Sequence, residues 1–84
     1  MSTFGSLTAD ACAEALATIT RDAEATSVNE AELERRIDMI IEPYLATPGE
    51  DDSSQRRVLL VQRLQQKCDG PACRRVSEYI LQSE

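Results

Sequence analysis

The three cysteines are the residues of this chain whose type and spacing come closest to supporting chemistry. Cys68 and Cys73 are separated by Asp-Gly-Pro-Ala, a turn that can bring two cysteines within reach of a disulfide. In an oxidising compartment we expect that bond; in a reducing cytoplasm we favour two small apolar residues at a helix end. Cys12 is remote in sequence and the chain has no histidine, so we predict no metal site.

The acidic residues are the other candidates, but the sequence pairs none of them with an activated nucleophile. Histidine, the usual general base near neutral pH, is absent. Glu34, Asp38 and Glu42 recur along one flank of an expected helix, and residues 50–52 form an acidic run. Such runs are typically hydrated surface, so we expect no enzymatic activity and no cofactor.

The charges divide the chain into an acidic and a basic part. Residues 1–52 carry 12 acidic and 3 basic side chains (net −9), whereas residues 53–84 carry 3 acidic and 6 basic ones (net +3). We expect these parts to fold against each other, because opposite charges on facing helix surfaces pair readily. The total of −6 disfavours general binding to nucleic acid or to a membrane surface, since both attract positively charged proteins.

Length and composition predict a single folded domain. The chain has 84 residues, of which 42% are hydrophobic and 29% charged, as in folded proteins rather than disordered ones. No apolar run is long enough to span a bilayer. The N-terminal residues lack the basic and apolar regions of a secretory signal, so we expect a cytoplasmic protein, although a mature secreted form would look the same.

Helical periodicity dominates the sequence and predicts an all-α fold, either a small four-helix bundle or a helical array. Apolar residues recur at spacings of three and four in four segments, at about residues 8–25, 30–45, 53–67 and 71–82. The only strong break lies within residues 46–52, where a proline–glycine pair precedes three acids. This break is too short to separate two domains.

The segment 30–45 has the clearest helical signature, and we expect the other helices to pack around it. Asn29 is a suitable N-cap, and Glu32 stands at the capping-box position. The apolar stripe is wide and comprises Leu33, Ile37, Ile40, Ile41 and Tyr44. Pro43 predicts a kink or an end of the helix near Glu42. The alanine-rich first helix is expected to bury less apolar area.

The residue pattern of the last two expected helices predicts a surface that binds another protein. The segment 71–82 is expected to bury Ala72, Cys73, Val76, Tyr79 and Ile80, and to turn Arg74, Ser77 and Leu81 outward. In the segment 53–67 the inner face comprises Leu60, Val61, Leu64 and Cys68, with Val58 at its edge. The residues that we predict to contact a partner are Arg56, Leu59, Arg63, Lys67 and Leu81.

A large apolar residue among cations, as at Leu59, is typical of the centre of a mixed interface. We therefore expect a small acidic helical module for protein–protein interaction, acting through an apolar and basic helix face. Adaptors, regulators, inhibitors and secretion chaperones are of this kind. The expected partner is another protein or a second copy of the chain.

A DNA-binding regulator is the alternative. Residues 53–82 could form a helix-turn-helix, with Arg74 and Arg75 near the start of its second helix contacting phosphate or bases. Gln65, Gln66 and Asp69 stand where such motifs normally have apolar or small residues. Because the chain as a whole is acidic, nucleic acid is the less favoured partner.

Overall fold

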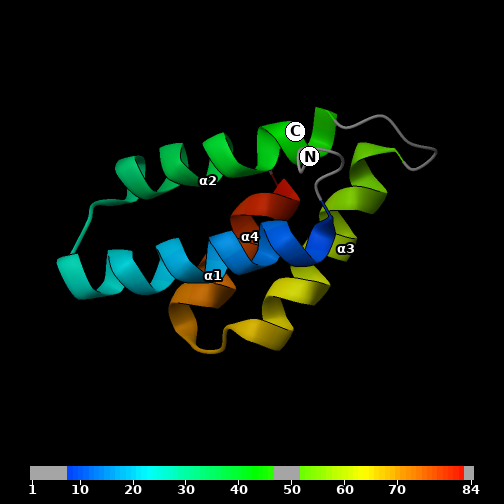
Figure 1. Ribbon diagram of the computed structural model, residues 1–84. Coiled ribbons are helices and arrows are strands. Elements are labelled where there is room, and N and C mark those ends of the chain that lie inside the picture. The colour runs from blue at the N-terminus through cyan, green and yellow to red at the C-terminus, as the bar shows by residue number, and fades with distance from the viewer. Residues whose placement is uncertain (1–7, 47–51, 83–84) are drawn as a thin grey trace, which may run out of the picture.

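The computed structural model describes residues 8–46 and 52–82, and within those ranges it contains four α-helices and no strand (Figure 1). The helices are α1 (Ala9–Thr26), α2 (Glu30–Ala46), α3 (Ser53–Lys67) and α4 (Pro71–Gln82). The all-α prediction is confirmed, and every helix end lies within one residue of its expected position. The predicted proline–glycine break falls mainly on residues 47–51, outside the described ranges.

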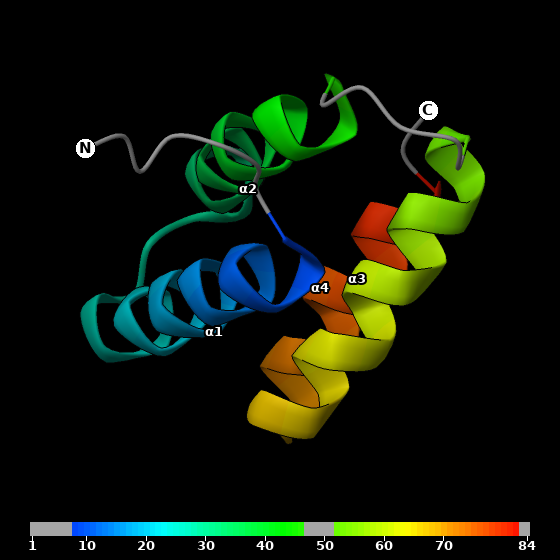
Figure 2. The same cartoon turned by 45° about the vertical axis from the view of Figure 1, so that its right-hand side comes forward.

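The helices form two hairpins. α1 and α2 lie side by side and antiparallel, and so do α3 and α4, whose axes cross the first pair steeply (Figures 1 and 2). α1 packs against all three other helices. The fold is therefore a helical array around α1 rather than a bundle of four aligned helices.

Side-chain caps mark three of the four helix starts. The side-chain oxygens of Thr8, Asn29 and Asp52 each accept a hydrogen bond, 2.8–3.0 Å long, from the backbone N–H three residues later. α4 begins at Pro71, directly after Gly70, whose φ of +113° is readily adopted only by glycine. The cap at Asn29 and the start of α4 at residue 71 are as the sequence predicts.

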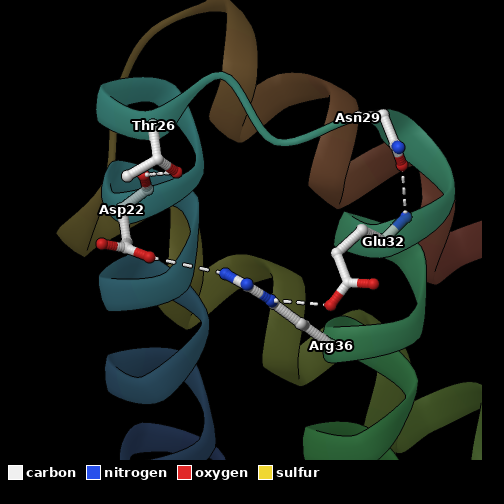
Figure 3. A network of polar contacts seen from close by, with 5 residues as sticks. All are labelled: Asp22, Thr26, Asn29, Glu32 and Arg36. Atoms are coloured by element: carbon white, nitrogen blue, oxygen red, sulfur yellow. Dashed lines mark hydrogen bonds and ion pairs between the residues drawn. The ribbon is translucent and has the colours of Figure 1, made fainter.

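Arg36 bridges α1 and α2 near the turn that joins them, as Figure 3 shows. Its Nη1 lies 3.4 Å from Asp22 Oδ2 on α1, and its Nε lies 3.3 Å from Glu32 Oε2 on α2. The Glu32 carboxylate thus accepts a hydrogen bond from Arg36, a role that the predicted capping box did not assign to it. These charges are largely exposed, so each pair contributes at most about 1 kcal/mol to stability.

α1 is the central helix, so the expectation that the chain packs around the segment 30–45 is wrong. α1 buries Cys12, Ala13, Leu16, Ala17, Thr20 and Ala23. Most of these side chains are small, and small side chains let neighbouring helices approach closely on more than one side. α2 packs mainly against α1 and less extensively against α3, and it buries Ile37, Ile41 and Tyr44, while Leu33 and Ile40 are partly buried.

Pro43 does not end α2, which continues to Ala46. The proline nitrogen carries no hydrogen, so the bond that a helix would normally make to the Met39 carbonyl is missing there. Tertiary contacts hold the last turn nevertheless, because Tyr44 is buried and its carbonyl accepts a hydrogen bond from α3. Of the two outcomes predicted for Pro43, a kink or an end near Glu42, the end does not occur, and the helix reaches its expected limit near residue 45.

α4 buries Cys73, Val76, Ser77 and Ile80. The expectation that Ser77 faces outward is wrong, because this residue directly follows Val76 and precedes Ile80 by three positions, on the same helix face. Tyr79 is only partly buried, and its hydroxyl donates to the Asp38 carboxylate, at 3.0 and 3.2 Å from the two oxygens. Among the helices of the described ranges, none is both long and apolar enough to cross a membrane.

Candidate interaction surface

The structure separates the three cations that were predicted to share an outward face. Arg56 is buried, and its Nη1 donates to the Tyr44 carbonyl oxygen at 2.9 Å. The Tyr44 hydroxyl in turn donates to the Arg56 carbonyl oxygen at 3.4 Å, and the guanidinium carbon lies 5.9 Å from the centre of the tyrosine ring. The expectation that Arg56 lies on an outward face with Leu59 is therefore wrong.

The C-terminal end of α2 explains why Arg56 turns inward. The last carbonyls of a helix have no partner within it, and the helix dipole makes this end attractive to cations. Arg56 also precedes the fully buried Leu60 by four residues, which places the two about 40° apart around the helix. It therefore lies on the flank of the buried face.

Two further arginines bind helix C-termini in the same way. Arg57 Nη1 donates to the Ile80 carbonyl in the last turn of α4 at 3.0 Å, and Arg21 Nη2 donates to the Lys67 carbonyl at the end of α3 at 3.2 Å. Neither α2 nor α4 has a basic residue in its own last turn. Neighbouring helices thus supply the positive charge that these ends attract.

Lys67 forms ion pairs with two acidic residues of α1. Its Nζ lies 3.1 Å from Glu14 Oε1 and 3.2 Å from Asp10 Oδ1, and hydrogen bonds to these carboxylates raise the pKa of Lys67 above its ordinary value. Arg75 likewise lies 3.5 Å from Glu30 on α2. These pairs join the basic part of the chain to the acidic part, as the charge distribution predicts. Lys67 is accordingly poorly placed to bind a partner.

What remains of the predicted surface is the outer side of α3. Leu59 has 37% of its surface exposed and Val58 has 46%, and the two lie side by side. They line a shallow, open depression together with Ser54, Gln55 and Gln62. Arg63, one turn after Leu59, is exposed and forms no hydrogen bond or ion pair with the residues that the structure describes. We call these six residues the α3 outer face.

Sequence reasoning missed Val58, Gln55 and Gln62 as members of this surface. Val58 was placed at the edge of the core, although it precedes Leu60 by two residues and therefore lies about 200° away around the helix. That angle was the signal that could have found it. The two glutamines gave no signal of their own, because exposed glutamines are common on helices.

Leu81 and Met39 are exposed by 48% and 69% but stand apart from the α3 outer face. Leu81 lies near the end of α4 and Met39 lies on α2, and neither lines the depression on α3. Single exposed apolar residues are normal and need no partner. The structure thus does not bring the predicted Leu81 together with Leu59.

A second depression lies between α1, α2 and the start of α4. It has a volume of about 160 Å³ and is lined by Thr20, Ala23, Glu24, Val28, Glu30, Leu33, Ala72 and Arg75. Sites for small organic ligands usually enclose roughly 300–1,000 Å³. This depression is too small, and the Arg75–Glu30 ion pair already occupies its polar rim.

The arrangement of α3 and α4 argues against the DNA-binding alternative. The two helices run antiparallel (Figure 2), whereas those of a helix-turn-helix cross at about 90–120°. Arg75 is paired with Glu30 of α2. Of the two predicted DNA contacts, only Arg74 is exposed without a hydrogen bond or ion pair to a described residue. One free arginine is a small electrostatic basis for binding phosphates.

The cysteines show no reactive site. A disulfide joins Cys68 to Cys73, whose Cα atoms are 5.9 Å apart, and it ties the end of α3 to the first turn of α4. Cys12 is buried, and burial raises its pKa to about 11, so the reactive thiolate is scarce near neutral pH. Within the described ranges no cluster of three or more cysteine or acidic side chains could hold a metal ion.

No model of a known protein family matches the chain, and neither the curated proteins nor the solved structures contain a match to it.

Proposed function

We propose that this chain is a protein–protein interaction module whose contact surface is the α3 outer face. The observation that carries the proposal is the exposure of two adjacent large apolar side chains, Val58 and Leu59, on a face that no other described element covers. Of the five residues predicted to contact a partner, Leu59 and Arg63 belong to this face. Arg56 and Lys67 instead bind α2 and α1, and Leu81 lies apart on α4.

The energetics of this face favour a protein partner. Full burial of a valine or leucine side chain contributes about 1.5–3 kcal/mol, so covering both residues would recover a useful fraction of that amount. Their neighbours Ser54, Gln55 and Gln62 are uncharged, so their desolvation costs less than that of acids or lysines. Arg63 remains available for a hydrogen bond or an ion pair at the edge of the contact.

A pair of matched variants tests the proposal. Leu59→Asp places a charge in the centre of the face, and Met39→Asp places the same charge at a large apolar residue on α2 that is exposed by 69%, away from the face. We expect Leu59→Asp to lose the proteins, or the second copy of the chain, that the tagged wild-type protein retains in affinity purification. Met39→Asp should retain them.

Both variants should keep the far-UV circular dichroism of the wild type, because both positions are exposed. The proposal fails if Leu59→Asp retains every partner of the wild type, or if Met39→Asp loses them equally.

A further inference from the structure

The α3 outer face shows the same pattern when it is read from either end. Val58 and Leu59 form its centre, Gln55 precedes Val58 by three residues, and Gln62 follows Leu59 by three residues. Ser54 and Arg63 stand one position further out. A surface with such a centre matches itself when it is rotated by half a turn, which is the requirement for an isologous contact.

We propose that this face binds a second copy of the chain, through antiparallel packing of two α3 helices about a two-fold axis between Val58 and Leu59. The inference rests on the proposed function and names its partner. Around that axis Val58 faces Leu59 of the second copy, and Gln55 faces Gln62 of the second copy. Apolar groups thus meet apolar groups, and each amide meets another amide, which can both donate and accept.

Charge also fits this pairing. In the same geometry Arg63 faces Ser54 of the second copy, next to the exposed carboxylate of Asp52 that caps α3. The two Arg63 residues are separated by about 13 Å along the helices, so they repel each other only weakly at ordinary ionic strength. Each copy thereby offers an acid to the otherwise unpaired arginine of the other.

The overall charge makes other contacts between copies less favourable. The chain carries a net charge of −6, and two copies therefore repel each other. α1 carries four acidic residues and α2 carries five, whereas α3 carries none. A contact through α3 therefore brings no acidic residues of α1 or α2 together. It also keeps the acidic hairpin formed by α1 and α2 of one copy away from that of the other.

Sedimentation equilibrium tests the association. A contact of one helix face is small, so we expect a weak dimer whose mass rises from 9.3 kDa towards twice that value between roughly 10 μM and 1 mM protein. Salt should strengthen it a few-fold, because salt screens the repulsion between the two acidic copies. Leu59→Asp should remain monomeric throughout, and Met39→Asp should dimerise like the wild type.

Cross-linking tests the antiparallel register. Under mild oxidation, a mixture of Gln55→Cys and Gln62→Cys proteins should form a disulfide-linked dimer, because these two positions face each other. Each variant alone should not, since its own two copies of the new cysteine lie about 10 Å apart along the helices, beyond the usual disulfide range. Met39→Cys is the control, and it should form no disulfide-linked dimer either alone or in a mixture with Gln55→Cys or Gln62→Cys.

The outcomes separate this inference from the proposed function. If each variant links with itself and the mixture does not, the antiparallel geometry is overturned. If the wild type stays at 9.3 kDa up to about 1 mM and no mixture links, the second copy is overturned as the partner. Should Leu59→Asp then still lose another captured protein, the proposed function stands with a different occupant.

Discussion

The two faces of α3 each carry one arginine and one leucine, but the pair on one face is part of the fold and the pair on the other face is not. On the inner face an arginine precedes a leucine by four residues (Arg56 and Leu60), and on the outer face a leucine precedes an arginine by four (Leu59 and Arg63). Leu60 is fully buried and Arg56 is bonded to α2. Leu59 is partly exposed and Arg63 is not bonded to any residue that the structure describes.

The difference shows that neighbouring elements, rather than residue type, assign these roles. An arginine becomes structural where a helix C-terminus offers unpaired carbonyls, as the ends of α2, α3 and α4 do. The same residue stays available for a partner where no such end is near. The inner and outer residues should therefore respond to mutation in opposite ways.

The largest contrast is expected between the adjacent leucines. Leu60→Ala should lower the free energy of unfolding by about 2–5 kcal/mol, because it leaves a cavity in the core. Leu59→Ala should change it by roughly 0.5 kcal/mol or less, because its side chain is partly solvated. Urea denaturation of both variants, at a protein concentration too low for association, measures the two free energies of unfolding. Equal losses of unfolding free energy would mean that the two faces are not different environments.

The two arginines should show a smaller contrast. Arg56→Met keeps the volume of the aliphatic stem but leaves the buried Tyr44 carbonyl without the guanidinium, so we expect a loss of about 1–3 kcal/mol in unfolding free energy. Arg63→Met should be nearly neutral in stability, at roughly 0.5 kcal/mol or less. Thermal unfolding followed by circular dichroism compares them, and a destabilised Arg63→Met would show that Arg63 has a structural partner after all.

The smallest expected contrast is between the reactivity of a buried thiol and that of a thiol on the α3 outer face. At pH 8 Cys12 should react with a thiol reagent only as the protein unfolds, whereas a Leu59→Cys thiol should react at once. When the wild-type protein is unfolded in guanidinium without reductant, one free thiol per chain should react. Three free thiols would show that Cys68 and Cys73 are not joined by a disulfide.

The same thiol predicts the effect of alkaline pH. Burial raises the pKa of Cys12 from 9.0 to about 11, so above pH 9 the thiol ionises in the unfolded chain while it stays protonated in the folded one. The contribution of this group to stability is therefore complete below pH 9 and falls progressively between pH 9 and about 11. A Cys12→Ala variant should show a smaller decrease over that interval.

Much of the local structure was predictable because short-range rules determine it. The caps at Thr8, Asn29 and Asp52 depend on a side-chain oxygen and a backbone N–H three residues away. The candidate site was predictable only in part. Leu59 and Arg63 follow from helical spacing, but Arg56 does not, since its partner Tyr44 belongs to a helix whose position no local pattern reveals.

By itself, the sequence determined the number and limits of the helices, because periodicity and capping act within a few residues. It also determined that the acidic and basic parts attract each other, although not which charges would meet. Only the tertiary structure decided that α1 lies at the centre, that three arginines bind helix ends, and that Val58 and Leu59 stay uncovered. These outcomes depend on which helix surfaces approach one another, and the small residues of α1 allow that approach from more than one side.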